Sequence, residues 1–407
     1  MSPQHTFWNA TLVDGRGGTP VAGAYVTIED DRIVAIGTAT GDPPANAVDL
    51  AGRTLMPGLI DAHVHLSSDT ERSPGFGPPA ARHGEDPRPR ELGYFILANT
   101  ARAMLRAGIT TVRDVGAYDG EAIVLRRAVE LGLVDGPQIL SCGRIVTATS
   151  PGARIFTSMY CEADGPWAMR QAVRQQIKDG ADYVKAMATG ARSVEREDPE
   201  PAQMTREELA AVVDEAHRMG VRVAAHAEGL EGARLAIEEG VDTIEHGLSL
   251  HREPALLDRM AERGIVLVPT LTTFHDLADR FAADFTPRLV ERAKSQLDEA
   301  YRTLGLARAA GVTIAMGYDS GPPGASANEL VRLAEGGLGA LEAIRAATAG
   351  SAAALGLDDR GTIEVGKRAD ILVVDGDPVA EPTVLVDPDR IRLVVKGGRD
   401  GARSDTA

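Results

Sequence analysis

The chain has 407 residues, of which 43% are hydrophobic and 25% are charged, as in an ordinary globular protein with a large core. Its 59 acidic and 43 basic residues give a formal net charge of −16, which argues against nucleic acid or an anionic membrane surface as a partner. The sequence has no apolar run of membrane-spanning length, no secretory signal pattern and only two cysteines, so we expect a cytoplasmic protein.

Both ends of the chain alternate apolar and polar residues in short segments separated by clusters of Asp and Gly. These segments are 9–13, 24–28, 32–37, 361–366, 369–375 and 391–395. A period of two between turn residues is typical of antiparallel strands. We expect residues 1–55 and 358–407 to be the two parts of one smaller β-sandwich domain.

Between these ends, residues 56–357 alternate apolar strands with amphipathic helices. In one helix, Thr205 and Glu208 are spaced as a capping box and Gly220 ends the amphipathic pattern. Strand–helix alternation without hairpin signals predicts an α/β fold, a (β/α)8 TIM barrel, with an open doubly wound sheet as the alternative. The eight expected strands are 59–65, 110–115, 138–142, 182–187, 221–226, 242–246, 264–269 and 312–317.

Polar residues of one chemical kind stand at the C-terminal ends of these strands, where barrel enzymes place their catalytic groups. His63 and His65 are two residues apart, so one strand face can carry both. His226, His246 and Asp319 end three further strands. Imidazole nitrogen and carboxylate oxygen are suitable ligands for zinc. A bound metal ion would lower the pKa of a water toward about 7, and Asp319 could accept its proton.

Lys185, in the fourth expected strand, does not fit this pattern as an ammonium group, because a cation repels a metal ion. It could be a desolvated lysine paired with a carboxylate such as Asp114. It could also form a Schiff base, as in an aldolase-like barrel.

Several motifs together resemble the amidohydrolase superfamily. The similar branch is the imidazolonepropionase-related group, which includes barrel-type Xaa-Pro dipeptidases and ochratoxinase-like metal-dependent hydrolases. The resemblance covers nearly the whole chain. The segments that carry it are 56–65, 184–185, 225–229, 244–247, 317–320 and 361–370.

This resemblance implies a centre of two divalent metal ions, with zinc as the expected element, and a CO2-derived carboxylate on Lys185. It implies that His63, His65, Lys185 and Asp319 hold the more buried ion, and that Lys185, His226 and His246 hold the second. A metal-bridging hydroxide would attack a carbonyl group, with Asp319 acting first as general base and then as general acid toward the leaving amine.

The presence of Lys185 favours the binuclear hydrolases over imidazolonepropionases and deaminases, which use one metal ion. We expect a small-molecule substrate with a peptide-like amide bond, such as an N-acyl amino acid or a dipeptide. Hydrolysis of an organophosphate, carbamate or lactone on the same metal centre is the alternative. A non-catalytic barrel relative and a Schiff-base lyase are alternatives of other classes. Related enzymes often form homo-oligomers, and this chain is compatible with that state.

Loops at the strand ends should set the substrate. Residues 67–91 and 193–204 are rich in Pro and charge, which suits either mobile lids or solvated linkers. Arg154 and Arg192 lie where dipeptidases of this branch usually have other residues. Either could bind a substrate carboxylate through its bidentate fork or form a surface salt bridge. The further candidates for the pocket wall are Tyr318 and His275.

Overall fold

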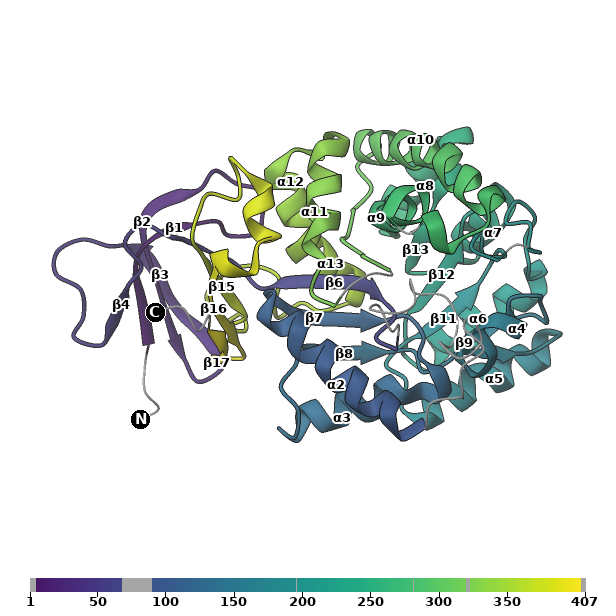
Figure 1. Cartoon of the computed structure of the whole chain (residues 1–407), viewed down its shortest axis with the longest axis horizontal. Coiled ribbons are helices and arrows are strands. Elements are labelled where there is room, and N and C mark those ends of the chain that lie inside the picture. The colour runs from purple at the N-terminus through teal and green to yellow at the C-terminus, as the bar shows by residue number, and fades with distance from the viewer. Residues whose placement is uncertain (1–4, 68–89, 195, 281, 320–322, 404–407) are drawn as a thin grey trace.

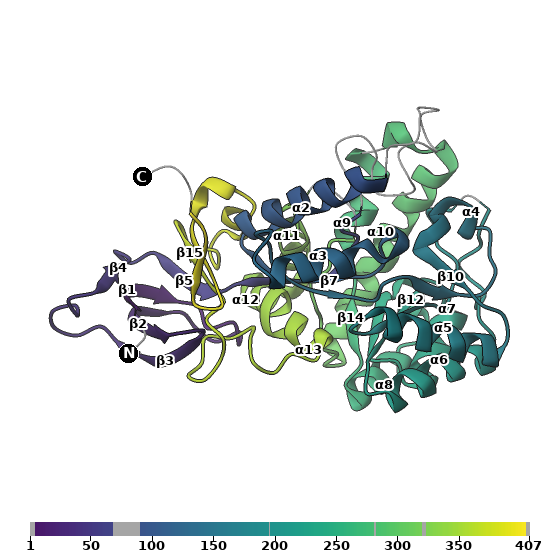
Figure 2. The same ribbon diagram turned by 90° about the horizontal axis from the view of Figure 1, so that it is seen from below.

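A computed structural model of the chain describes residues 5–67, 90–194, 196–280, 282–319 and 323–403. A larger α/β body lies beside a smaller sheet that contains both ends of the described chain (Figures 1 and 2). Most of the first expected lid, residues 68–89, lies outside the described residues. None of the helices in the described ranges combines the length and hydropathy that crossing a membrane requires.

The smaller sheet has eight strands drawn from both ends of the sequence, in the order β17-β16-β15-β5-β1-β2-β3, with β4 paired to β1. The two ends meet where β5 and β15 pair antiparallel, with Leu55 opposite Val373. Both side chains belong to one buried apolar cluster, together with Val26 and Ile33. The bounds are β1 (His5–Leu12), β2 (Val21–Glu29), β3 (Arg32–Thr38), β4 (Ala47–Asp49), β5 (Thr54–Pro57), β15 (Ile371–Val374), β16 (Ile391–Lys396) and β17 (Arg399–Arg403).

The strands of the larger body are all parallel and form two sheets. The three-stranded sheet runs β6-β7-β8 and the six-stranded sheet β10-β9-β11-β12-β13-β14. The bounds are β6 (Leu59–Val64), β7 (Ile109–Asp114), β8 (Gln138–Ser141), β9 (Ile145–Thr147), β10 (Tyr160–Glu162), β11 (Val184–Met187), β12 (Val223–Ala227), β13 (Thr243–His246) and β14 (Val266–Val268).

Residues 313–319 connect these two sheets on one side. The carbonyl of Thr313 accepts from the N–H of Leu267 in β14, and the carbonyl of Met316 accepts from Ala62 in β6. This segment stands where the eighth strand is expected, but it forms only isolated bridges, at Ile314 and Asp319. On the opposite side, the N–H of Asp182 donates to the carbonyl of Ser141 at 2.8 Å, which joins the end of β8 to the chain entering β11.

Helices cover the outer faces of the parallel strands (Figures 1 and 2). Leu209 and Val212 of α6 share a buried cluster with Val184 of β11 and Val223 of β12. Each such side chain contributes about 1.5–3 kcal/mol on burial. The helices are α2 (Arg90–Arg106), α3 (Glu121–Glu130), α4 (Ala153–Phe156), α5 (Pro166–Asp179), α6 (Arg206–Arg218), α7 (Leu230–Glu239), α8 (Ala255–Arg263), α9 (Leu271–His275), α10 (Pro287–Ala309), α11 (Ala327–Leu333), α12 (Ala340–Arg345) and α13 (Ser351–Leu355).

The predicted capping box at the start of α6 is confirmed. The Thr205 hydroxyl accepts from the N–H of Glu208, and the Glu208 carboxylate accepts from the N–H of Thr205. Because α6 packs its apolar face on Val184, the next residue of β11, Lys185, is directed to the other face of the strand. The helix layer therefore decides which strand residues face the interior.

Candidate metal centre

A cavity lies at the C-terminal ends of the parallel strands, with a volume of about 600 Å3 including its open mouth. Strand ends contribute most of its polar lining, and the segments that follow the strands contribute most of its apolar lining. The lining residues are His63, His65, Ile145, Phe156, Met159, Tyr160, Lys185, Met187, Ala191, Arg192, Ser193, His226, Glu228, His246, Thr273, Phe274, Leu277 and Asp319. The cavity therefore contains all six of the sequence-predicted metal ligands.

His63, His65 and Asp319 form the first donor group, whose ligand atoms all lie within 4.8 Å of one another. Oδ1 of Asp319 is 3.4 Å from Nε2 of His63 and 3.6 Å from Nε2 of His65. Strand alternation in β6 turns both imidazoles to one side. Asp319 adopts a left-handed backbone with a φ of 66°, and its N–H donates to the carbonyl of His63 at 2.6 Å. Non-glycine residues in this conformation are uncommon and cluster at functional sites.

His226, Glu228 and His246 form a second buried donor group of the same size. Oε1 of Glu228 is 3.5 Å from Nε2 of His226, and the two imidazole centroids are 4.6 Å apart. His246 also has a left-handed backbone, with a φ of 70°. In a regular strand, Glu245 and His246 would point to opposite faces. The turned backbone accounts for both of them facing the interior.

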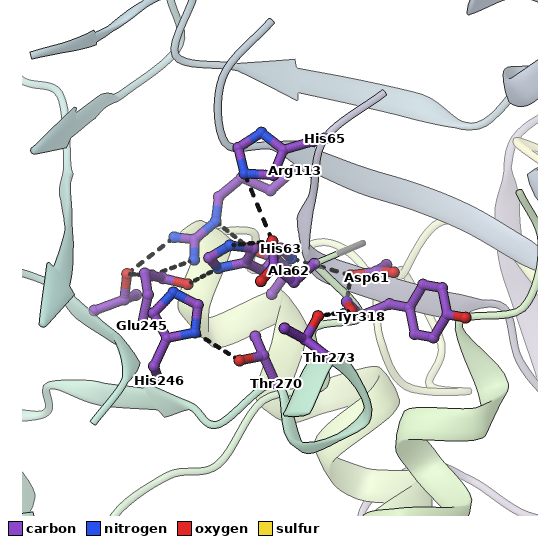
Figure 3. Close-up of polar contacts among 12 residues, drawn as sticks. Asp61, Ala62, His63, His65, Arg113, Glu245, His246, Thr270, Thr273 and Tyr318 are labelled. Carbon is purple, nitrogen blue, oxygen red and sulfur yellow. Dashed lines mark hydrogen bonds and ion pairs between the residues drawn. The ribbon is translucent and has the colours of Figure 1, made fainter. Parts of the chain in front are cut away.

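In three of the four imidazoles, Nδ1 makes a hydrogen bond on the side of the ring opposite Nε2. His63 Nδ1 contacts Oε2 of Glu245 at 2.6 Å, and His65 Nδ1 contacts the Gly116 carbonyl at 2.8 Å. His246 Nδ1 contacts the Thr270 hydroxyl at 2.7 Å (Figure 3). Such contacts fix ring orientation and leave Nε2 for a metal ion. Burial lowers the pKa of His65 to about 4, which favours the neutral imidazole that ligation requires.

The Lys185 side chain is 2% exposed, and its amine makes no hydrogen bond or ion pair with a described residue. Burial lowers the pKa of its amine, although Glu245 opposes this effect. The expected alternative partner, Asp114, instead accepts hydrogen bonds from the Leu66 N–H at 3.1 Å and the Ser141 hydroxyl at 2.9 Å. Lys185 is therefore not a structural lysine paired with Asp114.

Glu245 is fully buried and connects His63 to Arg113 (Figure 3). Its Oε1 accepts from Nη2 of Arg113 at 2.7 Å, and Nε of Arg113 donates to the Ala62 carbonyl at 2.6 Å. Burial alone would raise the pKa of Glu245, but the positive charges of Arg113 and Lys185 outweigh burial and hold this pKa well below its ordinary value. The carboxylate is thus ionised and fixed behind His63.

The four candidate substrate residues lie in different places. Arg192 is buried and lines the cavity, whereas Arg154 is exposed on α4 and is absent from the lining. The ring of Tyr318 is buried and directed away from the imidazoles (Figure 3). Nε2 of His275 is hydrogen bonded to the Tyr301 hydroxyl at 2.8 Å. Of these four residues, the cavity lining contains only Arg192.

The described part of the second expected lid is anchored rather than solvated. Glu197 is 6% exposed, and its carboxylate accepts from the Gly152 N–H at 2.6 Å and the Ala191 N–H at 2.7 Å. It therefore ties the loop after β9 to the loop after β11. Arg292 of α10 adds a hydrogen bond to the carbonyl of Arg192 at 3.1 Å.

Three residues of this site are missed by the sequence analysis: Glu228, Glu245 and Arg113. Glu228 follows His226 by two residues and Glu245 follows Thr243 by two, so strand periodicity offers a signal for both. Arg113 has no local signal, because its partner is 132 residues away in sequence.

Comparisons with known proteins relate the chain to one enzyme family. The sequence model of the amidohydrolase family matches residues 54–400. An ochratoxinase from Aspergillus niger is 30% identical over 94% of this chain and 83% of that protein. An imidazolonepropionase from Micrococcus luteus is 30% identical over 90% of each chain. The crystal structure of a Xaa-Pro dipeptidase with bound methionine superposes with a TM-score of 0.87 and 29% identity, covering 99% of this chain and 100% of that one.

The family match covers residues 54–400, and the alignment with the ochratoxinase covers 94% of the chain. The resemblance stated from the motifs is therefore confirmed. The chain belongs to the amidohydrolase family and is a hydrolase that acts on carbon–nitrogen bonds.

Proposed function

We propose that the chain is a binuclear metal-dependent amidohydrolase that cleaves a peptide-like amide bond, in an N-acyl amino acid or a dipeptide. One observation carries the proposal: two groups of metal-ligating atoms converge on one cavity that Lys185 also lines. The similarity to an ochratoxinase and a Xaa-Pro dipeptidase supports an amide as the bond that is cut.

The donor chemistry fits two divalent ions, which we propose to be zinc. Imidazole nitrogens and a carboxylate are suitable zinc ligands. Nδ1 of His63, His65 and His246 is already engaged elsewhere, which leaves Nε2 of these rings for an ion. In His226 the engaged nitrogen is Nε2, at 3.2 Å from the Gly190 carbonyl, which leaves Nδ1. An ammonium group at Lys185 would repel both ions, so we propose that CO2 carboxylates its amine and makes it an anion. The proposed ligands are His63, His65, Lys185 and Asp319 for one ion, and Lys185, His226 and His246 for the other.

In the proposed reaction, the bound ions would supply Lewis acidity, lowering the pKa of a water and polarising the substrate carbonyl. Asp319 accepts the proton of the attacking water on its carboxylate and delivers it to the departing amine nitrogen. The backbone hydrogen bond from Asp319 to His63 keeps this carboxylate at the strand end. Glu245 keeps the His63 ring oriented throughout.

The proposal extends to the domains. Residues 56–357 would form a closed (β/α)8 barrel, and residues 1–55 and 358–407 a β-sandwich. Support for closure comes from residues 313–319, which bond to β6 and β14, and from the hydrogen bond between Asp182 and Ser141 on the other side. A ring of parallel strands brings all of the strand ends to one mouth.

Metal analysis coupled to a hydrolysis screen tests this function. The purified chain is assayed for metal content and for hydrolysis of N-acyl amino acids, Xaa-Pro and Xaa-Arg dipeptides and aryl amides. We expect two zinc equivalents per chain and hydrolysis of at least one of these classes. Failure of the metal-loaded protein to hydrolyse any of them would refute the amidase proposal.

A lysine variant tests the binuclear centre separately. Lys185→Met should lower the metal content to one equivalent or less and abolish hydrolysis, because it removes the shared ligand. Lys178→Met, at an exposed lysine of α5, is the matched control and should keep both properties. Two retained metal equivalents in Lys185→Met would contradict the assignment of the lysine.

A further inference from the structure

Arg192 lies in the loop after β11 and is held in place before any ligand binds. Its Nε donates to Oε2 of Glu228 at 2.6 Å, and its guanidinium stacks on Phe274, with Cζ 5.0 Å from the ring centroid. Its backbone N–H donates to the same Glu228 oxygen at 3.1 Å, and its carbonyl accepts from Arg292. Such a fixed side chain loses little conformational entropy when it binds a ligand.

One nitrogen of this guanidinium, Nη1, is buried and has no hydrogen-bond partner among the described residues. A buried N–H without an acceptor costs free energy, so an occupant of the cavity that supplies an acceptor is favoured. Arg192 lines the same cavity as His226 and Asp319. Guanidinium N–H groups bind carboxylate oxygens most strongly, because the hydrogen bond is charge-assisted.

We propose that Arg192 binds the carboxylate of the substrate and so selects amides whose leaving amine carries a carboxylate. This inference rests on the proposed amidase function and adds the residue that sets its substrate preference. Arg154, the other candidate for this role, is exposed and does not line the cavity.

The distances suit such a substrate. The carboxylate of Glu228 alone bridges the space between His226 and Arg192. Its Oε1 is 3.5 Å from Nε2 of His226, and its Oε2 is 2.6 Å from Nε of Arg192. In an N-acyl amino acid or a dipeptide, three covalent bonds, about 4 Å in total, join the scissile carbonyl carbon to the terminal carboxylate carbon. An amide at the candidate metal ligands can therefore reach Arg192 with its carboxylate.

The remaining cavity wall is mostly apolar and includes Phe156, Met159 and Leu277. It can receive an apolar acyl group or an apolar side chain. The substrate class is thus an amide with an apolar substituent and an adjacent free carboxylate.

The test compares three substrates with their C-terminal primary amides: N-acetyl-L-phenylalanine, L-alanyl-L-proline and L-alanyl-L-arginine. For each pair that is hydrolysed, the measured quantity is the ratio of kcat/KM for the carboxylate to kcat/KM for the amide. We expect a ratio of about 10 to 100 in the natural chain, the range of a charge-assisted hydrogen bond. In Arg192→Met the ratio should fall to about 1, mainly through a higher KM for the carboxylate. Arg154→Met is the matched control and should keep the natural ratio.

A double variant, Arg192→Met with Glu228→Gln, avoids leaving a buried carboxylate unpaired and should lose the preference equally. Calorimetric titration with L-phenylalanine, a carboxylate product, should show weaker binding to both variants. A ratio near 1 in the natural chain, or an unchanged ratio in both variants, overturns the role of Arg192 and leaves the amidase proposal standing. Hydrolysis of none of the six compounds overturns the role of Arg192, whereas the amidase proposal falls only if the wider screen of N-acyl amino acids, dipeptides and aryl amides also shows no hydrolysis.

Discussion

A substitution at Glu245 tests whether its contacts with Arg113 and His63 stabilise the chain and orient the candidate metal ligand. Glu245→Gln keeps the shape of the side chain but removes the charge that lies 2.7 Å from Nη2 of Arg113. Arg113 is 3% exposed and would remain as a buried cation without a counterion. Removing one partner of a buried ion pair costs about 3–5 kcal/mol. We therefore expect the free energy of unfolding to fall by about that amount.

This cost translates into a measurable change in Tm. At about 2.1 cal/mol/K per residue, the 407 residues have an unfolding entropy near 0.9 kcal/mol/K, so Tm should drop by about 4–6 °C. Zinc affinity should also fall by about 10- to 100-fold, because His63 loses the carboxylate that orients it. Circular dichroism measures Tm, and competition with a chelating dye measures zinc affinity.

Two further variants separate the two effects. Arg113→Met with Glu245→Gln leaves no unpaired charge, so most of the loss in Tm should be recovered while zinc affinity stays low. Glu262→Gln, at an exposed carboxylate on α8, is the matched control and should change neither quantity. A drop in Tm below 1 °C in Glu245→Gln, with unchanged zinc affinity, would refute this account of the network.

Three other outcomes are expected. Removal of metal ions by a chelator should lower Tm and abolish hydrolysis. Added zinc should restore both Tm and hydrolysis. Full activity after verified removal of the metal ions would contradict the metal centre. Glu215→Gln should destabilise the chain at pH 7 by about 1–2 kcal/mol, because hydrogen bonds from Arg174 and other arginines outweigh burial and lower the pKa of Glu215 to about 2. That contribution is complete above the unfolded pKa of 4.5 and is lost as the pH falls toward 2, so urea titrations should show a smaller difference at pH 3 than at pH 7. Thr205→Ala should cost about 0.5–2 kcal/mol without altering kcat/KM, and an unchanged unfolding midpoint would argue against the α6 cap.

The positions of the candidate ligands could be predicted because two rules suffice for them. Strand periodicity places His63 and His65 on one face, and parallel strands bring their C-terminal ends together. The second rule follows from the fold class, and the first depends only on residues near each other in sequence. The α6 cap is predictable for the same reason.

The features of the site that cannot be predicted depend on contacts between distant segments or on unusual backbone conformation. The pairing of Arg113 with Glu245 joins β7 to β13 across the interior. The inward direction of both Glu245 and His246 requires the left-handed backbone at His246, which no periodicity predicts. The choice between Arg192 and Arg154 is made by the anchoring of two loops through Glu197. The eighth segment bonds to both neighbouring strands but forms only isolated bridges, which its apolar composition does not predict.

The arrangement of charges bears on why Lys185 should be the shared ligand. Both buried glutamates near the imidazoles are engaged by arginines: Arg113 binds Glu245, and Arg192 binds Glu228 through Oε2. Each arginine compensates the charge of a carboxylate that could otherwise bind a metal ion. Among the described cavity residues, Asp319 is then the carboxylate without an arginine partner.

One uncompensated carboxylate is too little negative charge for two divalent ions, and an ammonium at Lys185 would make the deficit worse. The proposed carboxylation of the amine would change its charge from positive to negative in the cavity that both donor groups line. Burial favours this step, because it lowers the pKa of Lys185 and so increases the fraction of neutral amine that can react with CO2. The arginine–glutamate pairs and the unpaired lysine are thus two parts of one arrangement. In the proposed centre, the two pairs would fix the imidazoles and the substrate side, and the carboxylated lysine would supply the charge that the ions require.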